Sequence, residues 1–238
     1  MKIEYQKYNI IASDFFKNEY SSIYSYINMY YPIGLKSVDD KYSSYIGQKN
    51  LKRLIKNNIE NSENFKLRWT NGFLKKVSQE TNYHVLGATF GLVPNYGGKI
   101  ILKQSDDLRF STEIHFFVSL INNLYSIQIV YSDKFTTYER EFLSDITGYG
   151  INKIIVSPID NEFGELFLKL ENLIKENFLD AKFLPFRFDL IKLNKFEVPY
   201  EYSKDFCTQI SKAFFHKGKL MHEKTLIIGN IDYKIDEL

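Results

Sequence analysis

The segment Thr112-Glu-Ile-His-Phe-Phe-Val-Ser-Leu-Ile-Asn-Asn-Leu-Tyr-Ser-Ile-Gln-Ile-Val-Tyr131 decides the fold class of this 238-residue chain. It contains two runs rich in β-branched and aromatic residues, Thr112–Leu120 and Leu124–Tyr131, on either side of Asn122-Asn123. Residues of these types favour strands, and paired asparagines favour a tight turn. The segment therefore predicts two antiparallel strands joined by a short connection.

The residues just before this segment predict a second hairpin. His84–Val93 and Lys99–Lys103 are short β-rich runs, and Pro94-Asn95-Tyr96-Gly97-Gly98 separates them. Proline, asparagine and glycine are the usual turn residues, so we expect Gly97-Gly98 to lie in the turn. Together the runs predict an antiparallel meander of about four strands.

Helical periodicity appears on both sides of the predicted meander. Apolar residues recur at spacings of three and four over Asp14–Tyr30, Gln48–Ile59 and Asn161–Phe178, and more weakly over Phe65–Glu80. Ser13-Asp14 is a possible N-cap for the first helix. Further expected elements are strands over Lys2–Ile11, Ile151–Val156 and Phe183–Leu193, a helix from Ser203 to Phe215, and a hairpin of Thr225–Ile228 with Ile231–Ile235. We predict an α+β fold in which N-terminal helices precede a largely antiparallel sheet flanked by helices.

Length and composition predict a single domain over residues 1–238, with a possible subdomain boundary near residues 78–83. One cysteine, Cys207, excludes an intramolecular disulfide and a multi-cysteine zinc site. The first residues lack the apolar stretch of a secretory signal, and no apolar run is long enough to cross a membrane. We therefore expect a cytoplasmic protein that does not insert into a membrane.

Tyrosine is concentrated near the N-terminus, where five of the 18 tyrosines fall between Tyr20 and Tyr31. An AT-rich genome explains part of this abundance, because the chain also has 26 lysines among its 31 basic residues and only five arginines. The helical stripe assigns Tyr20, Tyr24 and Tyr30 to a core. The tyrosines left for a surface that meets a partner are Tyr26, Tyr31, Tyr42 and Tyr45.

A basic stripe follows these tyrosines on the predicted helix Gln48–Ile59. It consists of Lys49, Lys52, Arg53 and Lys56, which recur at helical spacing opposite an apolar face. Three interpretations remain open: a solvated helix face, a surface for an acidic protein, or a nucleic-acid contact that uses nearby tyrosines for stacking. The net charge of only +2 argues against a protein that coats DNA.

No motif for catalysis, for a cofactor or for a metal accompanies these features. The glycine pairs do not form a phosphate-binding loop, and Cys207 near His216 and His222 fits a buried thiol better than a nucleophile. Glu113 and His115 would share one strand face and could ligate a metal. Asp232-Tyr233-Lys234 with Asp160 is a weak match to a metal-dependent nuclease. We expect neither a cofactor nor a metal.

The sequence thus favours a non-enzymatic intracellular factor that binds another, possibly acidic, protein. An inhibitor or immunity-type protein that neutralises a toxin or effector by covering its surface is the leading hypothesis. The alternatives are a metal-dependent hydrolase or nuclease with dispersed acidic residues, and a nucleic-acid-binding protein that uses the basic helix at residues 49–56. The sequence does not predict an oligomeric state.

Overall fold

The computed structural model describes residues 2–4, 10–12, 20–89, 91–106, 109–139, 144–160, 162–200, 206–217 and 225–238. The predicted N-cap Ser13-Asp14, the cap Ser203 and His222 lie outside these residues. Helices and a mostly antiparallel sheet make up the fold, so the predicted α+β class is confirmed.

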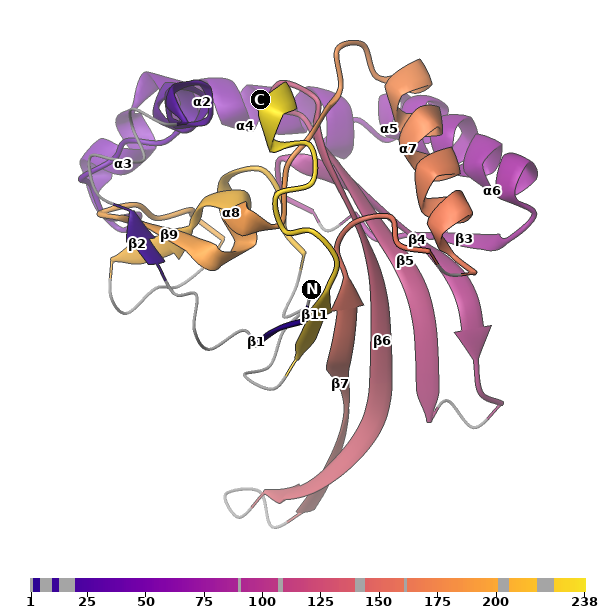
Figure 1. The fold of residues 1–238 in the computed structure, drawn as a ribbon. Coiled ribbons are helices and arrows are strands. Elements are labelled where there is room, and N and C mark those ends of the chain that lie inside the picture. The colour runs from indigo at the N-terminus through magenta and orange to yellow at the C-terminus, as the bar shows by residue number, and fades with distance from the viewer. Residues whose placement is uncertain are drawn as a thin grey trace.

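The larger sheet has eight strands, and β3 to β7 form an antiparallel meander within it. Its seven-strand path runs β1-β11-β7-β6-β5-β4-β3, with β8 paired in parallel to the start of β6. These strands are β1 (Lys2–Glu4), β3 (His84–Gly87), β4 (Asn95–Gln104), β5 (Phe110–Ser119), β6 (Leu124–Glu139), β7 (Ser144–Ile155), β8 (Lys182–Phe183) and β11 (Leu226–Ile228). In Figure 1 the β6–β7 hairpin extends well below the rest of the sheet.

The hairpin predicted at residues 112–131 is confirmed as β5 and β6. Asn122 and Asn123 both adopt positive φ, 53° and 49°, which a tight hairpin turn requires and asparagine tolerates. The position of the preceding turn was predicted wrongly, because Gly97 and Gly98 lie inside β4. A Cβ on Gly98 would come within 2.3 Å of the Phe116 ring, so this glycine is needed for close packing.

Helices enclose the sheet on one side, where α5, α6 and α7 lie together (Figure 1). The chain runs without a break through α5 (Ser62–Phe65), the π-helical η3 (Lys66–Leu74) and α6 (Lys75–Thr81), and α7 (Gly164–Asn177) packs beside them. Trp69 is fully buried there, stacks on Tyr96 with ring centroids 4.9 Å apart, and donates from Nε1 to the Gly97 carbonyl at 3.1 Å. Helical residues before position 78 and strand residues after position 83 thus share one core.

A second layer lies on the other side of the large sheet. It contains α2 (Ser21–Tyr30), α3 (Asp40–Ser44), α4 (Ile46–Ile55), which continues as the π-helical η2 (Lys56–Glu60), and α8 (Arg187–Leu190). A three-stranded sheet completes the layer in the order β10-β9-β2, made of Cys207–Gln209, Ile191–Asn194 and Ile10–Ala12. These elements enclose the N-terminal core, a cluster of buried side chains from α2, α3, α4, the β5–β6 hairpin and residues 184–198 and 210–215.

Several elements predicted in the C-terminal half and at the start of the chain were wrong. Phe183–Leu193 divides into β8, α8 and β9, and residues 207–213 form β10 and a 3₁₀ turn, η4 (Ile210–Ala213), instead of an α-helix. The closing hairpin does not form, because β11 pairs with β1 and β7 while residues 231–238 form turns and the 3₁₀ segment η5 (Ile235–Glu237). Residues 2–12 contribute strands to two different sheets. Each pairing partner is distant in sequence, so local pattern does not reveal it.

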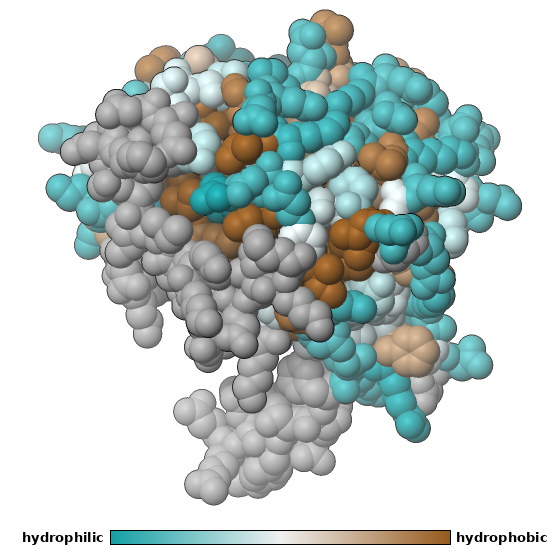
Figure 2. Space-filling model, viewed as in Figure 1, coloured by the Kyte–Doolittle hydropathy of each residue, from teal (hydrophilic) through white to brown (hydrophobic). Residues whose placement is uncertain are grey.

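The molecular surface shows how these layers meet. On the face drawn in Figure 2, hydrophobic residues reach the surface in the middle, between the small sheet and α7. Hydrophilic residues cover the helices around this area. No helix among the residues described above is both long and apolar enough to cross a bilayer.

Candidate functional site

The basic stripe lies on α4, and packing against α2 fixes the orientation of this helix. Gly47 lets the two helices approach closely, since a Cβ at this position would come within 2.2 Å of the Met29 carbonyl oxygen. Leu51 and Ile55 are buried in the N-terminal core. The opposite face of the helix is therefore turned to solvent.

That exposed face carries four cations, as the sequence predicted. Lys49, Lys52 and Arg53 lie on α4, and Lys56 is the first residue of η2. All four are exposed, and none forms an ion pair with a carboxylate in the described part of the chain. Their charges are thus not neutralised within the described fold.

An apolar pocket of about 390 Å³ opens beside the cations. Its lining residues come from α4, η2 and two distant loops: Gln48, Leu51, Lys52, Ile55, Lys56, Glu60, Leu92, Pro199 and Tyr200. Leu92 borders this pocket and is 70% exposed. The pocket brings together an aliphatic surface and two lysines of the stripe.

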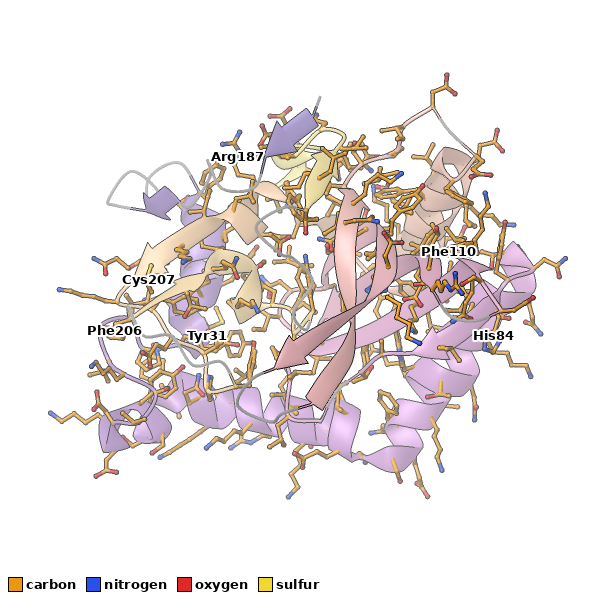
Figure 3. The ribbon with its side chains drawn as sticks, turned by 90° about the horizontal axis from the view of Figure 1, so that it is seen from below. Tyr31, His84, Phe110, Arg187, Phe206 and Cys207 are labelled. Atoms are coloured by element: carbon orange, nitrogen blue, oxygen red, sulfur yellow. The ribbon has the colours of Figure 1, made fainter. Side chains whose placement is uncertain are left out.

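Tyr31 and Tyr42 do not belong to this surface, so their expected exposure was wrong. Tyr31 is 0% exposed, and its hydroxyl donates to the Ala213 carbonyl at 2.8 Å. Tyr42 is 2% exposed and donates to the Glu197 carbonyl at 2.7 Å. Burial raises the pKa of both hydroxyls well above the ordinary tyrosine value. Figure 3 shows Tyr31 between the N-terminal helices and the strand that carries Cys207.

Tyr31 is buried because the core extends beyond the end of α2. Tyr31 follows the last residue of the helix, and its ring meets Phe196 edge to face at 5.6 Å. Residues 184–198 and 210–215 supply this part of the core from the opposite end of the chain. The spacing of apolar residues along α2 does not by itself reveal those contacts.

Tyr45 and Tyr26 remain partly exposed but differ in their surroundings. The Tyr45 hydroxyl donates to the Asn28 carbonyl at 2.7 Å, and Gln48 Nε2 donates to the Tyr30 carbonyl at the same distance. Both bonds satisfy carbonyls that the C-terminal end of α2 leaves without a helical partner. Tyr26 borders a separate pocket of about 330 Å³ next to Leu179. The candidate patch therefore narrows to Tyr45, the four cations and the pocket beside α4.

No family model, curated protein or solved structure matches this chain.

The alternative enzyme hypothesis requires Glu113, His115, Asp160 and Asp232 to converge in one cleft. Glu113 and His115 do meet on β5, where His115 Nε2 lies 2.7 Å from Glu113 Oε2, and Lys99 donates to the same carboxylate at 3.1 Å. Burial by itself would raise the pKa of Glu113, but His115 and Lys99 lower it below its ordinary value.

The two aspartates do not complete such a site. Asp232 is held by the guanidinium of Arg187, which binds both of its carboxylate oxygens. Within the described residues, no group of three or more His, Cys, Asp and Glu side chains is arranged to hold a metal. Cys207 is buried on β10, as expected from its apolar neighbours.

Two groups of residues were not predicted from the sequence. Leu92, Pro199 and Tyr200 complete the pocket beside α4, although more than a hundred residues separate Leu92 from Pro199. Lys217 and Asp189 form a buried ion pair at 2.8 Å. No local sequence signal marks either group.

Proposed function

We propose that this chain is a non-enzymatic protein-binding factor that blocks its partner by covering part of the partner's surface. Inhibitors and immunity-type proteins that neutralise a toxin or effector act in this way. The observation that supports the proposal is the placement of four exposed cations, none of them paired with a described carboxylate, beside the apolar pocket that Leu92 borders.

The two parts of this surface have different physical roles. Exposed lysines accelerate encounter with an acidic partner and contribute less to final affinity, because salt screens them. Burial of apolar groups supplies most of the affinity in such complexes and is concentrated in a small central area. A pocket bordered by cations offers both parts: charges that speed the encounter and an apolar surface that supplies affinity.

Nucleic acid is a poorer fit to the same surface. Arginine makes the commonest contacts to base edges, and only Arg53 is present among the four cations. Single-stranded binders stack bases on aromatic rings, whereas Tyr200 is the one aromatic side chain among the described residues that line the pocket, and its other apolar residues are Leu51, Ile55, Leu92 and Pro199. The aliphatic lining favours a protein partner.

Affinity capture with charge-reversed variants tests the proposal. The full chain is immobilised, exposed to a lysate of its native host, and compared with the triple variant Lys49→Glu, Lys52→Glu, Arg53→Glu. We expect a stoichiometric protein to be retained by the natural chain and lost from this variant. The triple variant Lys66→Glu, Lys75→Glu, Lys182→Glu is the control, because it changes net charge equally at exposed lysines away from α4.

Two results would contradict the proposal. One is equal retention of the captured protein by both charge-reversed variants, which would remove α4 from the interface. The other is recovery of nucleic acid in place of protein. If the retained protein is an enzyme or a toxin, its activity should fall when the natural chain is added and should persist with the α4 variant.

A further inference from the structure

We propose that the pocket beside α4 receives an apolar side chain from an acidic segment of the partner. The carboxylates of that segment lie along Lys49, Lys52, Arg53 and Lys56. This inference rests on the proposed function and adds the chemistry of the partner.

The pocket has a fixed base and one exposed wall. Leu51 and Ile55 form the base and are held in place by the N-terminal core. Tyr200 is anchored by a hydrogen bond from its hydroxyl to the Lys212 carbonyl and by an edge-to-face contact with His216 at 5.8 Å. Leu92 is the exposed wall. A preformed apolar recess of this kind suits a single anchoring side chain, since little ordering is needed when it binds.

Charge defines the rest of the ligand. Lys52 and Lys56 border the pocket, and Glu60 is the only carboxylate among its lining residues in the described part of the chain. At 1.5 Å rise per residue, the cations from Lys49 to Lys56 extend about 10 Å along the helix. A single carboxylate cannot reach all of them. A ligand that matches the whole stripe must carry several negative groups along its length.

These two requirements select an acidic peptide segment with one large apolar residue. A fatty acid would fill the pocket but leave most of the cations unmatched. A nucleic acid would match the cations but offers bases, which prefer aromatic platforms, to an aliphatic recess. A peptide supplies both kinds of group at the required spacing.

Synthetic peptides test this directly in fluorescence anisotropy. The probes are dodecapeptides that carry a central tryptophan between glutamates, a central alanine between glutamates, or a central tryptophan between glutamines. We expect the natural chain to bind the acidic tryptophan peptide about tenfold or more tightly than either of the others, because tenfold corresponds to about 1.4 kcal/mol and a buried aromatic anchor contributes at least that much.

Matched variants locate the contact. Leu92→Asn adds no charge beside Lys52 and Lys56, so it should lower affinity for the acidic tryptophan peptide about tenfold and leave the acidic alanine peptide unaffected. Leu67→Asn is the control, because Leu67 is 76% exposed on η3 and does not line the pocket. Lys52→Gln with Lys56→Gln should weaken both acidic peptides, whereas Lys66→Gln with Lys75→Gln should weaken neither.

Equal affinity for the acidic tryptophan and acidic alanine peptides would overturn the inference, as would equal effects of Leu92→Asn and Leu67→Asn. Binding of dodecanoate or oligothymidylate that depends on Leu92, without binding of the acidic tryptophan peptide, would replace it with a lipid or a nucleic acid. If the captured partner depends on the α4 cations but not on Leu92, the proposed function stands and the pocket assignment fails.

Discussion

Lys217 and Asp189 form an ion pair inside the protein, with Nζ 2.8 Å from Oδ2. Ser126 and Ser211 complete its hydrogen bonds, since Lys217 donates to Ser126 at 3.0 Å and Ser211 donates to Asp189 at 2.7 Å. Burial lowers the pKa of Lys217, and the charge of Asp189 opposes that effect. The pair links β6 to α8 and to the 3₁₀ turn η4.

Replacing one member of this ion pair should lower the free energy of unfolding far more than replacing both. Lys217→Met leaves Asp189 as an unpaired buried charge, so we expect the free energy of unfolding to fall by about 3–5 kcal/mol. The double variant Lys217→Met, Asp189→Leu should recover most of that loss. Urea denaturation of both variants measures the difference, and a double variant no more stable than the single one would disprove it.

Gly98→Ala should destabilise the sheet because there is no room for a methyl group. The added Cβ would lie 2.3 Å from the Phe116 ring and 2.9 Å from Leu74, both held in the core around Trp69. We expect a loss of about 1–3 kcal/mol in thermal or chemical denaturation. Gly91→Ala is the control, because nothing lies within 4 Å of its added Cβ. Similar losses in the two variants would show that close packing is not the cause.

Tyr31→Phe should reduce stability without changing partner binding. It removes the hydrogen bond to the buried Ala213 carbonyl, which is expected to cost about 1–3 kcal/mol. Tyr45→Phe removes a bond at the surface, where water replaces the donor, so its loss should be smaller. Denaturation measures both variants. Weaker peptide binding by Tyr31→Phe with unchanged stability would contradict the buried position of this ring.

Ionisation of the Tyr233 hydroxyl should lower the stability of the fold at alkaline pH. Burial and the hydrogen bond to Glu171 raise the pKa of Tyr233 from 10.0 to about 12. The folded state therefore keeps this proton where the unfolded state has lost it, so stability is fully present below pH 10 and falls as pH rises toward 12. We expect Tyr233→Phe to flatten this decline in denaturation curves measured across that interval. An unchanged slope would assign the decline to other groups.

The local pattern predicted those features that depend on neighbours in sequence. The alternation of Thr112–Tyr131 and the paired asparagines define the β5–β6 hairpin, because side-chain period and turn geometry are properties of the backbone nearby. The basic face of α4 follows in the same way from helical spacing. Neither feature needs information from the rest of the chain.

Features that depend on distant contacts were not predictable in this way. Gly97-Gly98 has the composition of a turn, yet it lies in β4, where the Ala88 carbonyl and the Phe116 ring leave no room for a Cβ at either position. Tyr31 and Tyr42 have the composition of an interface, yet carbonyls of Ala213 and Glu197 hold them inside. In each case a residue far away in sequence determines the environment.

The sequence by itself determined the fold class, the central hairpin and the exposed cations, because periodicity and turn chemistry act within a few residues. Only the tertiary structure decided which tyrosines are buried and where an apolar pocket meets those cations. The pocket is formed by α4 together with Leu92 and with Pro199 and Tyr200, segments that meet only in the folded chain. Whether a side chain is buried depends on how such segments pack together, and no single stretch of sequence specifies that packing.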